Sequence, residues 1–192
     1  MSQQTTDPES RKAGEPTYRL ELHTDAFDVR VYEKYLVAEV IVPGPAEEAS
    51  RTGFQMLAGY IFGGNRSASK LEMTTPVTQA PVSLPMTAPV TQAATEGGYR
   101  VHFVMPPGYT LSTLPVPNDA RVTLCEVPPQ RVAVRRYSGR WTDENYAQHL
   151  GELRDALRTA GIAAHGTPIL SRYNGPYVLP FLRRNEIWLP IE

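Results

Sequence analysis

The chain has 192 residues, of which 41% are apolar and 20% are charged. This composition provides a core for one compact domain and excludes a fully disordered or collagen-like chain. The 19 lysines and arginines oppose 20 aspartates and glutamates, so the chain lacks the basic balance typical of a nucleic-acid-binding protein. Eighteen prolines, well above the average share of about 5%, argue against a helical bundle and favour strands joined by proline-marked loops.

The N-terminal segment, residues 1–16, holds no aromatic or branched apolar residue. It is expected to form a disordered tail, followed by a single domain over residues 17–192. Since the sequence has neither a membrane-spanning apolar run of about 20 residues nor a hydrophobic signal region, we expect a cytoplasmic protein without membrane insertion. The single cysteine, Cys125, has no partner for a disulfide or a zinc site.

The first half of the domain predicts three strands and a helix. Polar and apolar residues alternate from Tyr18 to His23, and two further strands are expected at residues 29–33 and 36–42. Pro45 suits the first position of a helix, and Gly63 suits its C-terminal cap, which gives a helix of about four turns. One face of this helix carries apolar residues with the spacing i, i+3, i+7: Phe54, Leu57 and Ile61.

The second half predicts another helix with clear end signals. Thr142 is a suitable N-cap, and Gly161 follows the last turn. Its apolar stripe consists of Tyr146, Leu150, Leu153 and Leu157. Strands are expected on both sides of this helix, at residues 99–105, 121–127, 132–137, 168–173 and 186–191.

The order of elements indicates an internal duplication. Strands, helix and strands occur twice, and the sequence Val-Arg-Val-Tyr at 29–32 is similar to Val-Arg-Arg-Tyr at 134–137. Two such halves would form one antiparallel sheet around a pseudo-twofold axis, with a helix from each half packed on it and a ligand-sized cleft between. Five aromatic residues are candidates either for the lining of such a cleft or for the core, where the aromatic side chains of a small β-rich domain usually lie: Tyr60, Tyr137, Trp141, Tyr173 and Trp188.

A second repeat is local. The heptapeptide at residues 73–79 returns at residues 86–92 with six of seven positions matching, around the pattern Met-Thr-x-Pro-Val. Because proline cannot donate to a ladder, each copy is predicted to be a short edge segment in which the proline ends the pairing.

Five motifs, in this order, resemble those of the SOUL haem-binding protein family: Phe54-x-x-Leu57-x-x-Tyr60-Ile61-x-Gly63-x-Asn65, Met73-Thr74-x-Pro76-Val77, Phe103-Val104-Met105-Pro106, Leu114-Pro115-x-Pro117 and Arg183-Arg184-Asn185-Glu186. The resemblance implies an α+β fold, a distorted antiparallel barrel built from two βαββ-like pseudo-repeats with two flanking helices. It also implies non-covalent binding of haem or another tetrapyrrole in an apolar cleft beside the first helix.

The same resemblance suggests which residues bind the tetrapyrrole. In animal relatives an arginine, two methionines and a lysine of the first helix are proposed contacts, and the matching positions here are Arg51, Phe54, Ala58 and Gly59. Arg51 is suited to pair with a propionate, and Phe54 offers a flat apolar surface to the macrocycle. The implied cofactor-binding set is Arg51, Phe54, Leu57, Ala58 and Ile61.

No axial iron ligand is predicted. The position of a histidine proposed as ligand in one animal branch is occupied by Val31. His149, at the edge of an apolar helical stripe, is the remaining candidate for an iron ligand, although a histidine there is typically packed and hydrogen-bonded. Cys125, inside a predicted strand, is typical of a small buried apolar residue. The other histidines occupy polar strand positions or a loop: His23, His102 and His165.

A different class of function stays open. SOUL proteins share their architecture with GyrI-like small-molecule-binding domains, some of which are hydrolases that use a cleft glutamate, with Glu186 and Glu72 as the candidates here. Glu186 instead fits an ion-paired closure of the barrel. The sequence offers no paired carboxylates, Ser/His/Asp set or phosphate-binding loop, and no histidine pattern for haem degradation, so it favours a binding protein over an enzyme.

Overall fold

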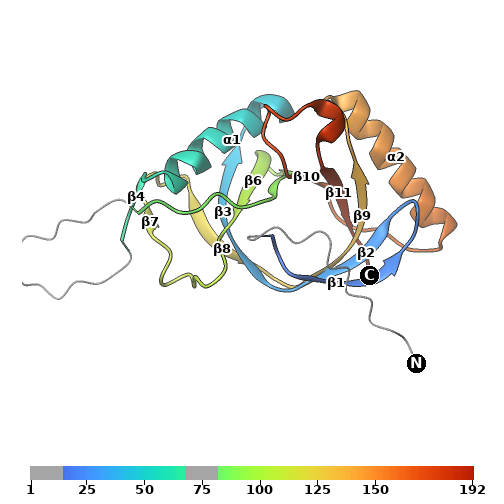
Figure 1. Ribbon diagram of the computed structural model, residues 1–192, viewed down its shortest axis with the longest axis horizontal. Coiled ribbons are helices and arrows are strands. Elements are labelled where there is room, and N and C mark those ends of the chain that lie inside the picture. The colour runs from blue at the N-terminus through green and yellow to red at the C-terminus, as the bar shows by residue number, and fades with distance from the viewer. Residues whose placement is uncertain (1–14, 68–81) are drawn as a thin grey trace, which may run out of the picture.

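A computed structural model describes residues 15–67 and 82–192. In this part of the chain, a nine-stranded antiparallel sheet curls into a half-barrel, and two helices, α1 (Ala46–Ile61) and α2 (Asp143–Thr159), cover one of its faces (Figure 1). The strands of the large sheet are β1 (Tyr18–His23), β2 (Asp28–Tyr32), β3 (Tyr35–Val42), β5 (Val90–Thr95), β6 (Gly98–Val104), β8 (Thr123–Val127), β9 (Gln130–Tyr137), β10 (Ile169–Arg172) and β11 (Asn185–Pro190). A small separate sheet pairs β4 (Asn65–Arg66) with β7 (Val116–Pro117).

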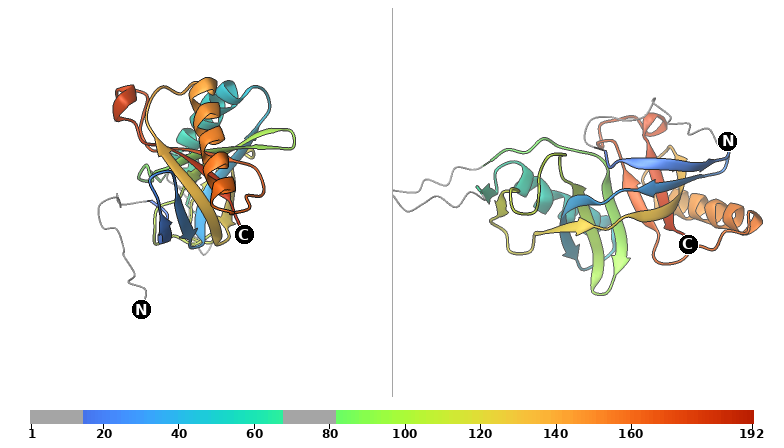
Figure 2. Two further views of the ribbon diagram at one scale, coloured as in Figure 1. Left: turned by 90° about the vertical axis from the view of Figure 1, so that its right-hand side faces the viewer. Right: turned by 90° about the horizontal axis from the view of Figure 1, so that it is seen from below.

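The strand order confirms the predicted two-fold organisation. The sheet runs β1-β2-β9-β11-β10-β5-β6-β3-β8. The unit β3-α1-β5-β6 has the same internal order as the unit β9-α2-β10-β11, and the two units meet where β5 pairs with β10. The two helices therefore lie on the same face, one over each half, and their N-terminal ends point towards the middle of the molecule (Figures 1 and 2).

One similarity used to infer the duplication relates the wrong strands. The tetrapeptides at 29–32 and 134–137 lie in β2 and β9, which pair directly, with Val29 opposite Ala133. The strand equivalent to β9 is β3, because each precedes the helix of its own unit. Matching positions of the two tetrapeptides face opposite sides of the sheet, because Val29 packs with Ala133 under α2, whereas Val134 packs with Tyr32 and Trp188.

The second copy of the Met-Thr-x-Pro-Val repeat is not an edge segment. It leads into β5, which has a partner on both sides, β10 and β6. Pro89 stands one residue before this strand and so removes no hydrogen bond from its ladders. The first copy, at residues 73–79, lies outside the described residues.

The predicted helix ends are confirmed where the chain supplies a capping group. Thr142 Oγ1 accepts a hydrogen bond from the Asn145 backbone N–H at 3.2 Å, which caps the start of α2. Gly161, just past its end, has a φ of 69°, a conformation that favours glycine. The domain reaches slightly further than predicted, because Pro16 is buried and Glu15 pairs with Arg184 at 3.0 Å.

The core of the first half forms where α1 presses on β3 and β6. The contact is closest at Gly53, where an added Cβ would lie 2.7 Å from Val101 Cγ2. Gly59, further along the same helix, is exposed, and a Cβ there would meet nothing within 4 Å. The two glycines therefore have opposite roles, since one permits close packing and the other only weakens the helix.

We expect Gly53→Ala to lower the free energy of unfolding by about 1–3 kcal/mol, because the new methyl group overpacks the α1–β6 contact. Gly59→Ala serves as the matched control and should raise the same free energy by about 0.5–1 kcal/mol, because alanine is the better helix former. Urea denaturation of both variants measures the difference. Equal effects of the two substitutions would contradict the close approach at Gly53.

Candidate functional site

A cavity of about 750 Å³ lies on the helix-covered face, between the N-terminal ends of α1 and α2 and above β5 and β10. We call it the interhelical cavity. Aromatic side chains form much of its wall: Tyr99, Tyr137, Trp141 and Tyr146. It lies over the pairing of the two βαββ units, where the sequence predicts a cleft.

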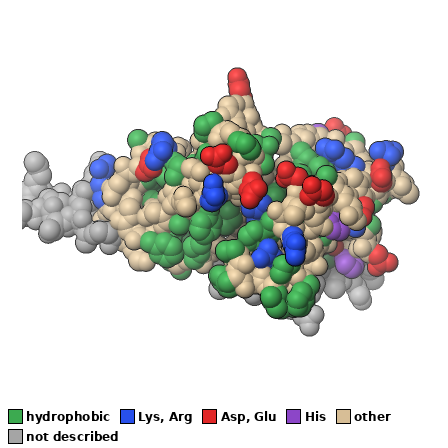
Figure 3. All heavy atoms as spheres, turned by 90° about the horizontal axis from the view of Figure 1, so that it is seen from above, with side chains coloured by type: hydrophobic (Ala, Val, Ile, Leu, Met, Phe, Trp, Pro, Cys, Tyr) green, Lys and Arg blue, Asp and Glu red, His purple; other side chains and the backbone are tan. Residues whose placement is uncertain are grey.

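The rim of the interhelical cavity is acidic. Glu47 comes from the first turn of α1, and Asp143 and Glu144 come from the first turn of α2. Carboxylates at these positions are stabilised by the positive ends of the helix dipoles. All three are exposed, and acidic side chains gather in the middle of this face (Figure 3). Their charges are therefore in contact with solvent and salt.

Arg172 supplies the opposite charge from β10. Its Nη1 donates to Ser50 Oγ at 2.7 Å, and its guanidinium carbon lies 4.8 Å from the centre of the Trp141 ring. Arg183 contacts the same ring at 4.3 Å. Burial lowers the pKa of the Arg172 guanidinium, and the positive charge of Arg183 acts in the same direction. The group stays cationic at neutral pH, because arginine starts from a very high pKa.

The predicted tetrapyrrole contacts divide into two sets on α1. Leu57 and Ile61 have exposed fractions of 0% and 1% and belong to the core under the helix. Arg51 is exposed, Ala58 is half-buried, and Phe54 is 39% exposed with its ring edge-on to Phe103 at 5.2 Å. The second set alone is accessible to a ligand in this structure.

A chain segment that runs back along α1 extends the accessible set. The Leu84 backbone N–H donates to Ile61 O at 3.0 Å, and Phe62 bridges to Ser83, so residues 82–89 start at the C-terminal end of α1 and lead to β5. Phe62 and Met86 are 67% and 46% exposed. We define the α1 flank as the surface formed by Arg51, Phe54, Ala58, Phe62 and Met86.

Two of the five aromatic candidates for the cleft line it, namely Tyr137 and Trp141. Trp188 is fully buried and stacks on Tyr32 with ring centres 4.5 Å apart. Tyr60 is also buried, and its hydroxyl donates to Pro115 O. These residues serve the core, as large aromatic side chains in a small domain usually do.

Glu186 is fully buried and holds a network of donors, which we call the Glu186 network. Arg30 Nη1 donates to both carboxylate oxygens at 3.2 and 3.1 Å, and Arg184 Nε donates to Oε1 at 3.0 Å. The Tyr173 hydroxyl and the Trp188 indole N–H donate to Oε2 at 2.8 and 2.9 Å. Burial alone would raise the pKa of Glu186, but Arg30 and Arg184 hold it below its usual value.

This arrangement is the ion-paired closure that the sequence predicts at residues 183–186. A carboxylate with a lowered pKa that accepts five hydrogen bonds from four side chains is a poor general base, because its lone pairs are already used. Glu72, the other glutamate considered for hydrolysis, lies outside the described residues.

Three histidines, His23, His102 and His149, and the single cysteine each lie close to a carboxylate of a neighbouring side chain. His149 Nδ1 lies 3.1 Å from Glu152 Oε2, and its ring packs on Tyr137 at 4.5 Å. His102 Nε2 lies 2.7 Å from Glu39 Oε2. Burial raises the pKa of the Cys125 thiol, and the nearby Glu39 carboxylate adds to this effect. Over residues 15–67 and 82–192, no three His, Cys, Asp or Glu side chains are grouped as they would be around a metal ion.

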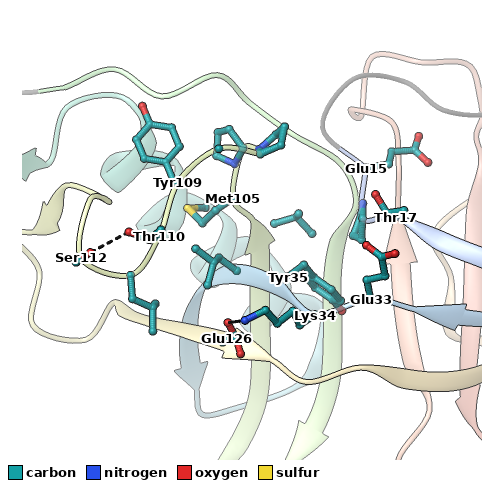
Figure 4. Close-up of a pocket in the computed structure, with 17 residues that line it drawn as sticks. Glu15, Thr17, Glu33, Lys34, Tyr35, Met105, Tyr109, Thr110, Ser112 and Glu126 are labelled. Carbon is teal, nitrogen blue, oxygen red and sulfur yellow. Dashed lines mark hydrogen bonds and ion pairs between the residues drawn. The ribbon is translucent and has the colours of Figure 1, made fainter.

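A second large cavity, of about 640 Å³, lies between the start of β3 and the loop that follows β6 (Figure 4). Its apolar wall includes Tyr35, Met105 and Tyr109. Lys34 and Glu126 face each other there, with Nζ 3.2 Å from Oε2. Its charged lysine is thus already paired, and the cavity is not lined by any of the five predicted cofactor-binding residues.

The fold is α+β, with two helices on one face of a half-barrel sheet and a cavity between the helix ends. Such an arrangement is suited to binding small molecules. A family model described as SOUL heme-binding protein matches residues 13–190, and the chain belongs to this family. Heme-binding protein 1 of Xenopus laevis is 27% identical over 165 residues, covering 85% of this chain and 82% of its own. Heme-binding protein 1 of Mus musculus is 26% identical over 156 residues, covering 81% and 78%.

Solved structures of other proteins share the fold. The C-terminal domain of EcmrR superposes with a TM-score of 0.58 at 13% identity, covering 91% of this chain and 98% of its own. A hydrolase from Listeria innocua superposes with a TM-score of 0.57 at 12% identity, covering 86% and 91%. At such low identity, these similarities support the architecture alone. In the part of the chain with described structure, neither helix has the length and apolar character needed to cross a membrane.

Proposed function

We propose that this protein binds haem or a related tetrapyrrole non-covalently on the α1 flank. The observation that carries the proposal is the pairing on α1 of an exposed cation, Arg51, with an accessible aromatic ring, Phe54, in a chain of the SOUL heme-binding protein family. A tetrapyrrole with propionate groups needs both features, a flat apolar surface and a cation at its edge.

The residues of the α1 flank would have separate roles. The exposed apolar groups of Phe54, Phe62 and Met86 would gain about 25 cal/mol for each Å² that the macrocycle removes from water. Arg51 would pair with a propionate at the solvent edge. Leu57 and Ile61, which lie in the core beneath the helix, would hold α1 in place rather than touch the ligand.

Binding on the α1 flank is expected to depend little on iron. All four histidines of the chain lie outside α1 and outside residues 82–89. Affinity would then come from burial of the macrocycle and from the propionate contact, which metal-free porphyrin shares. The balanced charge and single cysteine support the remainder of the proposal, a cytoplasmic protein whose partner is a tetrapyrrole and not a nucleic acid.

The test is a titration with haem and, separately, with protoporphyrin, followed by Soret absorbance. Phe54→Ala and Arg51→Gln should each weaken binding by about tenfold, which corresponds to about 1.4 kcal/mol. Arg158→Gln, which removes an exposed positive charge from α2, is the matched control and should bind as the unmodified protein does. Binding that is unaffected by both α1 substitutions would reject the α1 flank as the site.

A further inference from the structure

Two buried hydrogen-bond donors, one in the wall of the interhelical cavity and one beside it in the sheet, have no protein acceptor. In residues 15–67 and 82–192, this holds for Arg172 Nε and Asn185 Nδ2. Arg172 lines the cavity, and Asn185 lies directly opposite it in the β10–β11 ladder, so both side chains stand on the helix-covered face. Because the great majority of buried polar groups are hydrogen-bonded, two neighbouring donors of this kind indicate a site for an acceptor.

Trp141 fixes the orientation of the Asn185 amide. The indole N–H of Trp141 donates to Asn185 Oδ1 at 2.8 Å. An indole N–H can only donate, so the amide oxygen must face it, and the NH₂ group is directed elsewhere. Asn185 therefore presents a donor, as Arg172 does.

The charge of Arg172 is also unbalanced at short range. Arg30 and Arg184 both pair with Glu186 at 3.1 and 3.0 Å. Arg172, in contrast, has no carboxylate within ion-pair distance among the described residues; its side-chain hydrogen bond goes to Ser50. A buried guanidinium normally has an anionic partner, because burying an unpaired charge is costly. The acceptor that fits this site is thus an anion with two oxygens, which can accept from Arg172 and Asn185 together.

The rest of the cavity restricts the body of the ligand. Aromatic walls from Tyr99, Tyr137 and Tyr146 favour a flat apolar group, and the volume of about 750 Å³ accommodates one of two or three rings. Glu47, Asp143 and Glu144 at the rim disfavour a second negative charge on the outer part of the ligand. We propose that the interhelical cavity binds a monocarboxylate with a flat apolar body, held by Arg172 and Asn185.

Isothermal titration calorimetry with 2-naphthoate tests the charge requirement. The neutral 2-naphthalenemethanol and the cationic 2-naphthylmethylammonium have the same ring system and serve as ligand controls. We expect naphthoate to bind at least tenfold more tightly than either. Arg172→Gln should weaken naphthoate binding by about 10- to 100-fold, the range expected for a lost charge-assisted hydrogen bond. Arg136→Gln, at an exposed position of β9, should change nothing.

Asn185→Asp provides a second variant that does not depend on removing Arg172. The new carboxylate can still accept from Trp141 and can also pair with Arg172, so the cavity would carry its own anion. We expect this variant to lose naphthoate binding while its melting temperature rises. Circular dichroism establishes that each variant is folded. Naphthoate affinity equal to that of the unmodified protein in both variants, or preference for the alcohol or the amine, would overturn the proposal.

Competition with protoporphyrin distinguishes a free acid from a tetrapyrrole propionate. We expect both ligands to bind together, since the α1 flank and the carboxylate site use different residues. If protoporphyrin displaces naphthoate, the interhelical cavity still binds a carboxylate, and that carboxylate is a propionate group of the tetrapyrrole. Phe54→Ala should leave naphthoate affinity unchanged, so failure of the α1-flank proposal can be told apart from failure of this one.

Discussion

Glu186→Gln is expected to lower the free energy of unfolding by about 1.5–3 kcal/mol, the range for lost hydrogen bonds to charged groups. Glutamine keeps the shape of the side chain but removes the negative charge that Arg30 and Arg184 share. The Arg30 and Arg184 side chains are almost wholly buried, so water cannot fully hydrate their guanidinium groups. Arg30 keeps Asp28 at 2.6 Å and Arg184 keeps Glu15 at 3.0 Å, so the variant loses the shared buried carboxylate and its charge-assisted hydrogen bonds without leaving either cation wholly unpaired.

The effect of Glu186→Gln should depend on pH in a defined direction. The pKa of Glu186 is held below its usual value of 4.5 in the folded protein, against the effect of burial, by Arg30 and Arg184. The contribution of its charge is therefore fully present above pH about 4.5 and is lost as the pH falls through the lower pKa of the folded state. The difference in stability between the two proteins should narrow in acid.

Urea denaturation at neutral pH and at several pH values below 4.5 measures both expectations. In the double variant Arg30→Met with Glu186→Gln, the two losses of stability should be less than additive, because each substitution alone already removes the ion pair that the two residues share. Asp119→Asn, which changes an exposed carboxylate that pairs locally with Arg121, is the control for a simple loss of charge. A loss below about 1 kcal/mol in Glu186→Gln would show that the network contributes little.

Much of the fold follows from periodicity and end signals in the sequence. The alternation at Tyr18–His23, the N-cap at Thr142 and the glycine at 161 each correspond to an element that the structure contains. These features depend on interactions between residues close in the sequence, so they can be predicted from the sequence alone. The two-fold organisation of one antiparallel sheet also agrees, because two similar units allow few ways to close such a sheet.

Sequence reasoning fails where a position is decided by contacts between distant segments. The sequence does not predict β5, because Pro89 indicates an edge segment. In the structure Pro89 stands just outside the β5 ladder. Leu57 and Ile61 share a motif with Phe54, but the packing of α1 on β6 buries the first two and leaves the third accessible. A burial boundary within one helical face depends on the neighbouring elements, which the helical period does not specify.

The proposed carboxylate site of the interhelical cavity could not be identified from the sequence either. Asn185 lies in the charged motif at residues 183–186. In that motif the charges indicate an ion pair at Glu186 and give no role to the asparagine. The Arg172 and Asn185 side chains become a pair only through the β10–β11 register. The sequence shows only an arginine near the end of one predicted strand and an asparagine just before another, and this signal is too common to select a site.

Leu57→Ala is expected to lower the free energy of unfolding by about 2–5 kcal/mol and to leave tetrapyrrole affinity unchanged in the folded protein. Leu57 is fully buried between α1 and the sheet, so the substitution opens a cavity in the core. Phe54→Ala, one turn earlier on the helix, should show the reverse pattern, with a smaller loss of stability and a weaker affinity, because its ring is 39% exposed.

Thermal denaturation and Soret titration of the two variants, made at a temperature where both are folded, separate the two roles. The comparison bears directly on how the family motif is used, since the motif places both residues on one helix without saying which contacts a ligand. If Leu57→Ala weakens tetrapyrrole binding as strongly as Phe54→Ala does, the macrocycle must reach the core side of α1. The helix would then have to move away from β3 and β6 when the ligand binds, and binding should weaken the hydrogen-exchange protection of α1 instead of strengthening it.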